Sequence, residues 1–338
     1  MRNNYVVIPT YKEVDNLKVL LPKLSKYEVI IIDDNSQDGT IELCNKFKNV
    51  HVLVRPKKEG ISSAVLEGIK LLPRNSKVVV MDADLQHDFR LLSKIFNKLE
   101  KYDFVECVRI NKSSMSFIRR VISNISDLLF LAFVPETKVL KDRNTGFFGF
   151  RLESVDIKKL RPGIGEWKIV IDIFLALKRG SKITSISYFF GKRKYGKSKL
   201  SLASFFYTFK QLLRLNDYRI FKFAFVGFLG LIVNESILFY FVKFLRIQEY
   251  ISLVFSIEGS TLFNFVLLRE FVFDKRKSKN SLLKFHLAVL YSLIINYLVA
   301  LYLSLFVNYL FANFLGILIS FIFRYFYSEH KVWTEFSE

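Results

Sequence analysis

The sequence predicts two parts of different fold class: an α/β domain over residues 1–200 and an all-α membrane domain over residues 218–338. An amphipathic helix at residues 201–217 is expected to lie at the membrane interface and to join them. Two observations support this division. Short apolar runs alternate with helical patterns in the first part, whereas apolar stretches long enough to cross a bilayer fill the last part.

Four apolar runs have the length and continuity of buried parallel strands, at residues 5–8, 29–32, 52–54 and 78–81. Helical patterns separate these runs, at residues 16–24, 41–47 and 62–71. Strand–helix–strand units of this kind form open α/β sheets, which bind ligands at the carboxyl ends of their strands. The residues directly after each strand are therefore the candidates for a binding site.

Most of the formal net charge of +20 lies in the first part, because residues 1–217 hold 39 Lys and Arg against 23 Asp and Glu, a net charge of +16. A basic domain tethered to a bilayer is attracted to anionic lipid headgroups, so we expect a lipid surface and no nucleic acid as partner.

Cys44 and Cys107 fit no disulfide framework or zinc spacing, which suits a cytoplasmic catalytic domain. No signal peptide is expected at the N-terminus.

Polar clusters follow three of the strands, at residues 9–13, 33–36 and 82–87. The second cluster has a purely structural alternative as a helix-capping loop, and Asp82-Ala83-Asp84 has one as a solvated turn. The position of Asp82-Ala83-Asp84 favours a cation-binding role, because two carboxylates one residue apart after a buried strand repel each other unless a cation neutralises them. Mg²⁺ or Mn²⁺ would do so with few protein oxygens, and we expect Asp84 and the amide oxygen of Gln86 as ligands. His87 is an alternative further ligand, but a lone His beside a carboxylate motif is more often a hydrogen-bonding neighbour, and this is what we expect.

The three clusters read Pro-Thr-Tyr-Lys-Glu at 9–13, Asp-Asp-Asn-Ser-Gln-Asp-Gly-Thr at 33–40 and Asp-Ala-Asp-Leu-Gln-His at 82–87. In this order they resemble the family-two inverting glycosyltransferases, whose GT-A domain is a Rossmann-like nucleotide-sugar fold, and among them the dolichyl-phosphate mannose synthases. A fourth matching motif is Arg-Lys-Tyr-Gly-Lys-Ser-Lys-Leu at 193–200, and Asp-Arg-Asn-Thr-Gly-Phe-Phe at 142–148 resembles the acceptor loop of that family.

The resemblance implies a role for each matching residue. The nucleotide sugar would contact Pro9, Tyr11, Glu13, Ile32, Asp34, Asp82, Ala83, Asp84, Gln86, Arg109 and Lys168. The acceptor phosphate would contact Arg119, Ser123, Arg193 and Lys199. The catalytic residues among these would be Asp82, Asp84, Arg119 and Arg193.

Two basic segments have structural alternatives. Arg119 and Arg120 can be a solvated face, but the apolar stretch at residues 118–134 is shorter than a span and suits an interfacial helix. The cations at 193–199 can be a juxtamembrane segment held by anionic lipid, which is compatible with phosphate binding.

The implied reaction transfers mannose from GDP-mannose to dolichyl or another polyprenyl phosphate, with inversion. A phosphate monoester, with a second pKa of about 6, is anionic at neutral pH and needs little help from a general base. Departures from the family pattern leave the donor open: Lys12 replaces Asn, Ile61-Ser62 replaces Leu-Gly, and Cys107-Val108 replaces Gly-Ser. UDP-glucose is therefore an alternative donor, and lipid-sugar translocation is an alternative function.

The last part contains four apolar stretches, at about residues 221–245, 250–268, 282–307 and 310–327. Each approaches the ~20 residues that a spanning helix needs. The connection at 274–279 is strongly basic, whereas those at 246–249 and 308–309 are weakly charged, so the basic loop is expected on the cytoplasmic side. With an even number of spans, the catalytic domain and the C-terminus are expected there too.

The four stretches form an internal repeat of two helix pairs and resemble GtrA-like membrane domains. Lys222-Phe223 stands before Asn234 as Lys284-Phe285 stands before Asn296. Several polar residues lie within the stretches: Glu235, Glu258, Asn234, Asn264, Asn296 and Asn313. They either line a path for a lipid headgroup or hydrogen-bond between helices.

Overall fold

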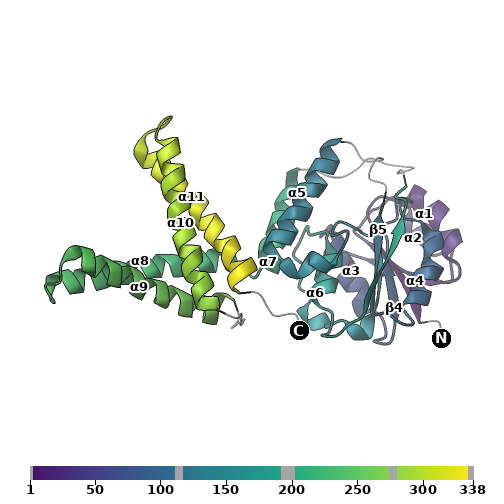
Figure 1. The fold of residues 1–338 in the computed structure, drawn as a ribbon. Helices are drawn as coiled ribbons and strands as arrows, with labels where there is room; N and C mark the ends of the chain where they lie inside the picture. Colours follow the sequence, from purple (N-terminus) through teal and green to yellow (C-terminus); the bar gives the residue numbers. More distant parts are fainter. Residues whose placement is uncertain (1–2, 111–116, 192–201, 274–279, 334–338) are drawn as a thin grey trace. The chain divides into compact units, whose positions relative to one another are not determined.

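The computed structural model describes residues 3–110, 117–191, 202–273 and 280–333. Two compact units share the chain, Met1–Leu215 and Asn216–Glu338, and each is described by itself (Figure 1). The first unit is α/β and the second is all-helical.

The first unit is built on a mixed sheet with the strand order β3-β2-β1-β4-β6-β5-β7 within the described residues. The strands are β1 Asn4–Thr10, β2 Glu28–Asp33, β3 Val50–Val54, β4 Lys77–Val80, β5 Phe104–Arg109, β6 Phe148–Arg151 and β7 Ile183–Tyr188. The first four are parallel to one another and confirm the four predicted strands. Strand β6 runs antiparallel between β4 and β5, an arrangement that no pattern in the sequence indicates.

Helices cover both faces of this sheet (Figure 1). They are α1 Val14–Leu20, α2 Thr40–Cys44, α3 Ile61–Lys70, α4 Leu92–Lys98, α5 Phe117–Phe133, α6 Ile169–Leu175 and α7 Leu202–Leu215. Because neither face of the central strands meets water, Val6, Val7 and Ile8 of β1 are all fully buried. This explains why these strands appear in the sequence as continuous apolar runs and do not alternate with polar residues.

Helix α7 packs against the rest of the first unit through polar contacts along one side. The Trp167 indole donates to Thr208 Oγ1 at 2.9 Å, and Arg214 pairs with Glu166 and Asp172. The other side of α7 exposes Phe206 and Phe209. Helix α5, which packs against α7 (Figure 1), likewise exposes a row of apolar side chains, namely Val121, Ile125, Leu128 and Leu131.

The second unit has four helices long and apolar enough to cross a membrane. They are α8 Arg219–Lys243, α9 Glu249–Leu267, α10 Ser281–Leu303 and α11 Tyr309–Tyr327. Helices α9 and α11 continue through π-helical turns, Leu268–Val272 and Ser328–Val332, which extend both beyond the predicted ends. The charged residues in these turns made the sequence pattern end early.

The helices pair as α8 with α9 and α10 with α11. The two pairs meet at the end where the chain enters this unit. There Trp333 is fully buried and stacks on Phe273 with 5.6 Å between ring centroids, and Arg219 pairs with Glu329 at 2.8 Å. Equivalent ends of the two predicted repeats therefore pack together.

Candidate active site

The polar clusters predicted from the sequence meet at one edge of the sheet. Strand register pairs Thr10 with Asp33 and Val7 with Val80, so parallel β1, β2 and β4 end side by side. The backbone N–H of Asp34 donates to the Thr10 carbonyl at 3.0 Å, and that of Lys12 donates to Ser36 Oγ at 2.8 Å. The loops after β1 and β2 are thereby tied together.

A buried ion pair holds Asp34 at this edge. Arg55, only 2% exposed, places Nη1 3.1 Å from Asp34 Oδ1 and donates through Nη2 to Glu59 and Ser63. Burial raises the pKa of Asp34, and the Arg55 charge opposes that shift. Arg55 thus fixes a predicted nucleotide-binding carboxylate, and no motif in the sequence pointed to it.

Tyr11 and Glu13 lie on the loop after β1. The ammonium of Lys58 lies over the Tyr11 ring, 4.4 Å from its centroid, and Glu13 accepts a hydrogen bond from Asn16 Nδ2 at 2.6 Å. Both side chains are half-buried. An aromatic ring and a carboxylate at the strand end suit contact with a nucleoside, which the resemblance also implies.

His87 supports the loop that carries Asp82 and Asp84. Its Nδ1 accepts the backbone N–H of Asp82 at 3.1 Å, which assigns the proton to Nε2, 3.6 Å from Asp82 Oδ2. Its ring stacks on Phe147 with centroids 5.1 Å apart. Burial lowers the pKa of His87 to about 4, so the ring is neutral at pH 7. His87 therefore acts as a hydrogen-bonding neighbour, as expected.

Asp84 and Gln86 point their polar groups around the same turn. Asp84 is 6% exposed, and its Oδ1 accepts the backbone N–H of Gln86 at 3.1 Å. Gln86 Nε2 donates to the Gly191 carbonyl at 2.9 Å, and the Gly191 N–H donates back to the Gln86 carbonyl. This ties the turn to the chain just before the basic motif at 193–200.

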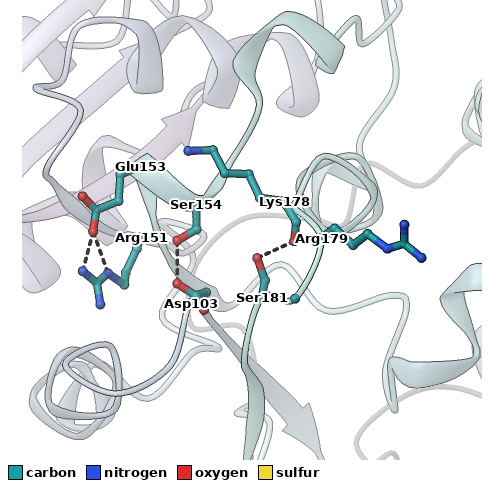
Figure 2. A pocket seen from close by; sticks show the side chains of 8 residues that line it. Asp103, Arg151, Glu153, Ser154, Lys178, Arg179 and Ser181 are labelled. Carbon is teal, nitrogen blue, oxygen red and sulfur yellow. Dashed lines mark hydrogen bonds and ion pairs between the residues drawn. The ribbon is translucent and has the colours of Figure 1, made fainter. Parts of the chain in front are cut away.

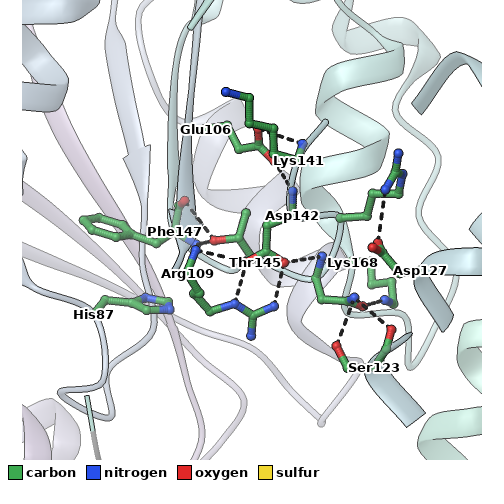
Figure 3. A network of polar contacts seen from close by, with 12 residues as sticks. His87, Glu106, Arg109, Ser123, Asp127, Lys141, Asp142, Thr145, Phe147 and Lys168 are labelled. Carbon is green, nitrogen blue, oxygen red and sulfur yellow. Dashed lines mark hydrogen bonds and ion pairs between the residues drawn. The ribbon is translucent and has the colours of Figure 1, made fainter. Parts of the chain in front are cut away.

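Arg109, at the end of β5, is clamped by the carboxylate of Asp142 (Figure 3). Its Nε and Nη2 each donate to one oxygen of Asp142 at 2.7 Å. Glu106, also buried, accepts the backbone N–H groups of Lys141 and Asp142 and so holds that loop. Bidentate pairing leaves the guanidinium little freedom, which suits a fixed contact to a substrate.

Asn144 connects Lys168 to Ser123 of helix α5. The Lys168 ammonium donates to Asn144 Oδ1, and Asn144 Nδ2 lies 3.3 Å from both the carbonyl and the hydroxyl of Ser123. Lys168 is 2% exposed and lies between the rings of Phe130 and Trp167. Burial lowers its pKa to about 7, far below the usual value for Lys.

Gly146, in the loop that carries Asp142 and Asn144, lies next to the Asp82 carboxylate. A Cβ at this position would lie 2.9 Å from Asp82 Oδ2, so only glycine lets the acceptor-loop motif approach the Asp82 carboxylate so closely. The guanidinium of Arg109 and the ring of His87 both face Phe190, at 5.4 and 5.8 Å. The Asp-x-Asp turn, Arg109 and the 142–148 loop therefore form one continuous site.

The donor atoms at this site suit a hard divalent cation. Asp82, Asp84 and the amide oxygen of Gln86 are oxygen ligands, which Mg²⁺ and Mn²⁺ prefer. In the part of the chain that the structure describes, no three His, Cys, Asp or Glu side chains gather to hold an ion by themselves. That fits an ion bound partly by substrate phosphates, as is usual for Mg²⁺.

Several predicted residues lie elsewhere or cannot be placed. The side chains of Ile32 and Ala83 are buried in the core, and Pro9 is half-buried in β1. Arg119 belongs to α5, one turn before Ser123, but its side chain is outside the described residues, as are Arg193 and Lys199. Asp142 and Asn144 stood within the quoted acceptor-loop motif, but no role was assigned to them.

A separate pocket of about 390 Å³ lies at the opposite edge of the sheet (Figure 2). Asp103 there accepts hydrogen bonds from Ser154 Oγ and the backbone of Lys182, directly before β5 and β7 begin. Its polar groups are engaged in holding these loops together, and none of the predicted site residues lines it.

Comparisons with known proteins match each of the two parts of the chain to a family. Residues 5–157 match the family described as Glycosyl transferase family 2, and residues 222–333 match the GtrA/DPMS transmembrane domain. A dolichol-phosphate mannosyltransferase of Pyrococcus furiosus is 34% identical, over 87% of this chain and 88% of its own. One from Saccharomyces cerevisiae is 31% identical, over 70% of this chain and 94% of its own.

Among solved structures, glucosyl-3-phosphoglycerate synthase from Mycobacterium tuberculosis, in complex with Mn²⁺, UDP-glucose and phosphoglyceric acid, superposes with a TM-score of 0.51. It shares 19% identity and covers 64% of this chain and 80% of its own, so it bears on the fold alone. The predicted fold class, a GT-A domain followed by a helical membrane domain, is confirmed.

The fold, the site at the strand edge and the four apolar helices define a multi-pass membrane glycosyltransferase. The chain belongs to the dolichol-phosphate mannosyltransferase family.

Proposed function

We propose that this protein transfers mannose from GDP-mannose to dolichyl or another polyprenyl phosphate, with inversion at the sugar carbon. The observation that carries the proposal is the polar network of Figure 3, which runs from Arg109 at the strand edge to Ser123 on α5. It links the place proposed for the donor to an amphipathic helix with an exposed apolar face. The names of the relatives at 31–34% identity support mannose as the sugar.

On the donor side, Tyr11, Glu13 and Asp34 would contact the nucleoside, and Asp82, Asp84 and Gln86 would lie at the diphosphate. A divalent ion held by Asp84 and Gln86 would supply charge neutralisation for the leaving nucleoside diphosphate. Arg109, held in place by Asp142, would add a fixed positive charge to the same site. His87 keeps the Asp82 turn in place as a neutral ring.

On the acceptor side, Arg119 and Ser123 on α5, together with Arg193 and Lys199, would bind the lipid phosphate. A phosphate oxygen forms the new bond to the sugar carbon from the side opposite the leaving diphosphate, whose bond to that carbon breaks. Because the acceptor is already anionic above its second pKa of about 6, no side chain has to remove a proton. The chain's task is to align two anions that repel each other.

The membrane would then provide the acceptor as well as the anchor. Exposed Leu128 on α5 and Phe206 on α7 would enter the interface, and the basic loop at 274–279 would face the cytoplasm. In this proposal the catalytic domain, over residues 1–200, and the C-terminus would lie on the cytoplasmic side, with 201–217 at the interface.

Radiolabelled donors test the proposal directly. The purified full-length protein is incubated with Mn²⁺, dolichyl phosphate in lipid vesicles, and either GDP-[¹⁴C]mannose or UDP-[¹⁴C]glucose. We expect labelled lipid only from GDP-mannose, and chelation of the metal should stop it. Product from UDP-glucose alone would make the protein a glucosyltransferase, and no product from either donor would refute the transferase proposal.

The match to the GtrA/DPMS membrane domain also keeps lipid-sugar translocation open as a second function. Asp84→Ala separates the two activities, because it should abolish synthesis and leave transport of preformed lipid-sugar across vesicles unchanged. If vesicles without the protein move the lipid-sugar across the bilayer as fast as vesicles that contain it, the protein does not translocate this lipid.

A further inference from the structure

Arg324 is a cation inside a membrane-spanning helix, α11, without a polar partner in the described part of the chain. Its guanidinium lies 5.7 Å from the centroid of the Phe223 ring, and an added Cβ on Gly227 would lie 3.6 Å from its Nη2. Charged side chains within spans are costly and usually face an anion or a water-filled path. The cation–π contact alone replaces only part of the lost hydration.

Arg324 lines a cavity of about 410 Å³ between α8, α10 and α11. Asn296 lines the same cavity, and its Oδ1 is buried without a hydrogen-bond partner among the described residues. Ser292 and Ser320 add hydroxyls, which donate to carbonyls of their own helices and keep their lone pairs. Polar groups from two neighbouring helices therefore surround one space.

The rim of the cavity is apolar and exposed. Leu293, Phe314 and Ile317 are each more than half exposed, on a surface that faces hydrocarbon in a membrane. A ligand that satisfies both ends needs an anionic head for Arg324 and an apolar tail for the rim. A lipid phosphate has this chemistry, and a guanidinium binds phosphate through two parallel N–H groups.

The depth of Arg324 suits a headgroup. It lies eight residues before Val332, the end of the π-helical turn, which at 1.5 Å per residue is about 12 Å from that end. Arg219, where α8 begins, pairs with Glu329 at the same end. The cavity thus lies between the helix ends and the middle of the span.

The first helix pair has no arginine at the position equivalent to Arg324. With the repeat offset of 60 residues, Asn264 occupies the position equivalent to Arg324 and packs against Gly230 of α8. The residue at the equivalent position of the first pair is therefore neutral. The charge at 324 is specific to the second pair.

We propose that Arg324, Asn296 and the surrounding helices form a binding site for the phosphate of a membrane lipid, separate from the active site. The lipid tail leaves across Phe314 and Ile317. The site goes beyond the proposed transfer reaction and does not depend on it.

Binding to the full-length protein in detergent, followed by native mass spectrometry, tests the site without donor or metal. All proteins carry Arg119→Ala, which weakens the acceptor contact proposed for the active site. Dolichyl phosphate and phosphatidylglycerol are the probes, and dolichol, which lacks the phosphate, is the control lipid. We expect Arg324→Gln to weaken phosphate-lipid binding at least tenfold, with dolichol unaffected.

Arg269→Gln is the matched control, because Arg269 lies in the π-helical turn of the first pair, half-exposed and paired with Glu270. It should bind both probes as the parent does. Loss for dolichyl phosphate alone supports a polyprenyl-phosphate site, and loss for both probes supports a general phospholipid site. Unchanged binding by Arg324→Gln, or equal loss with Arg269→Gln, overturns the proposal.

Two milder variants guard against misfolding of Arg324→Gln. Arg324→Lys keeps the charge and loses the paired N–H groups, so we expect an intermediate loss. Asn296→Ala removes a neutral partner and should weaken binding less than Arg324→Gln. If both bind the probes as tightly as the parent while the thermal unfolding of each is unchanged, the site is refuted.

Discussion

At the scale of single residues, the site depends on side chains whose charge or protonation is set by burial. Asp84, Lys168 and His87 are each less than a tenth exposed, yet they face different partners. His87 is neutral through burial, whereas Lys168 loses its proton near neutral pH. Two predictions follow from these environments.

Asp84→Asn should lower the transfer rate by at least ~100-fold at saturating metal, because the amide cannot supply the negative charge that a divalent ion needs. Initial rates across a Mn²⁺ titration measure the effect. Asp88→Asn is the control, since Asp88 lies on the same loop but caps a helical turn and pairs with Arg90. Asparagine caps equally well, so this variant should keep its activity. If both variants lose transfer activity to a similar extent, Asp84 contributes to the structure of the loop and not to metal binding.

Lys168 predicts a pH dependence of stability. Its pKa is about 7 in the folded protein and 10.5 when unfolded, so between these values the unfolded chain binds the extra proton. Stability should therefore rise with pH from 7 towards 10, by at most about 1.4 kcal/mol per pH unit. Below pH 7 both states are protonated and the slope from this group vanishes.

Lys168→Met removes the titrating group, so its unfolding curves should lack this rise. Thermal unfolding of both proteins at pH 6, 7, 8 and 9 gives the comparison. Parallel pH profiles would mean that the Lys168 charge persists in the fold, held by Asn144 and the rings of Phe130 and Trp167.

At the scale of elements, α5 and α7 carry the proposed contact with the bilayer surface. Polar groups fix α7 to the first unit, and both helices expose apolar side chains, such as Leu128 at 66%. A leucine transferred from water to an apolar environment gains roughly 1.5–3 kcal/mol. In the proposed function, these faces would bring the end of α5 that carries Arg119 and Ser123 close to lipid.

Leu128→Asp should lower kcat/KM for polyprenyl phosphate in vesicles about tenfold, because a charge replaces the apolar contact at the interface. The KM for the donor should not change. Leu71→Asp is the matched control, since Leu71 is 60% exposed just after α3 and outside these helices. An equal effect of both substitutions would argue against an interfacial role for α5. Assays with a short-chain, water-soluble acceptor should show no difference.

At the scale of the whole molecule, the even number of spans predicts that both ends of the membrane domain face one side. Single cysteines at Lys277 and Asn308 test this with a membrane-impermeant maleimide on intact cells. We expect Asn308→Cys to be labelled and Lys277→Cys to be protected until the cells are permeabilised. The reverse pattern would place the catalytic domain outside.

The two native cysteines should not interfere with this assay. Cys44 and Cys107 are fully buried, and burial raises the pKa of the Cys44 thiol to about 11. Thiols in this state react slowly with maleimides. The parent protein should therefore remain unlabelled under native conditions.

The sequence by itself determined the four parallel strands β1 to β4, the strand-end motifs and the four spans, because each depends on local patterns. Continuous apolar runs mark strands buried on both faces, and apolar stretches of ~20 residues mark spans. The turn at Asp82–His87 was evident for the same reason, since its residues are neighbours in the chain. Each of these features involves residues that are close together in the sequence.

Only the tertiary structure decided the partners that come from distant positions. Asp142 clamps Arg109 across 33 residues, Asn144 reaches Lys168, and Arg55 holds Asp34. Strand β6 is four residues long, and its antiparallel place between β4 and β5 depends on pairing that no local pattern encodes. The charge of Arg324, which has no polar partner among the described residues, likewise acquires meaning only from the cavity between three helices. Such contacts form when the chain folds, because burial brings together groups that are far apart in sequence.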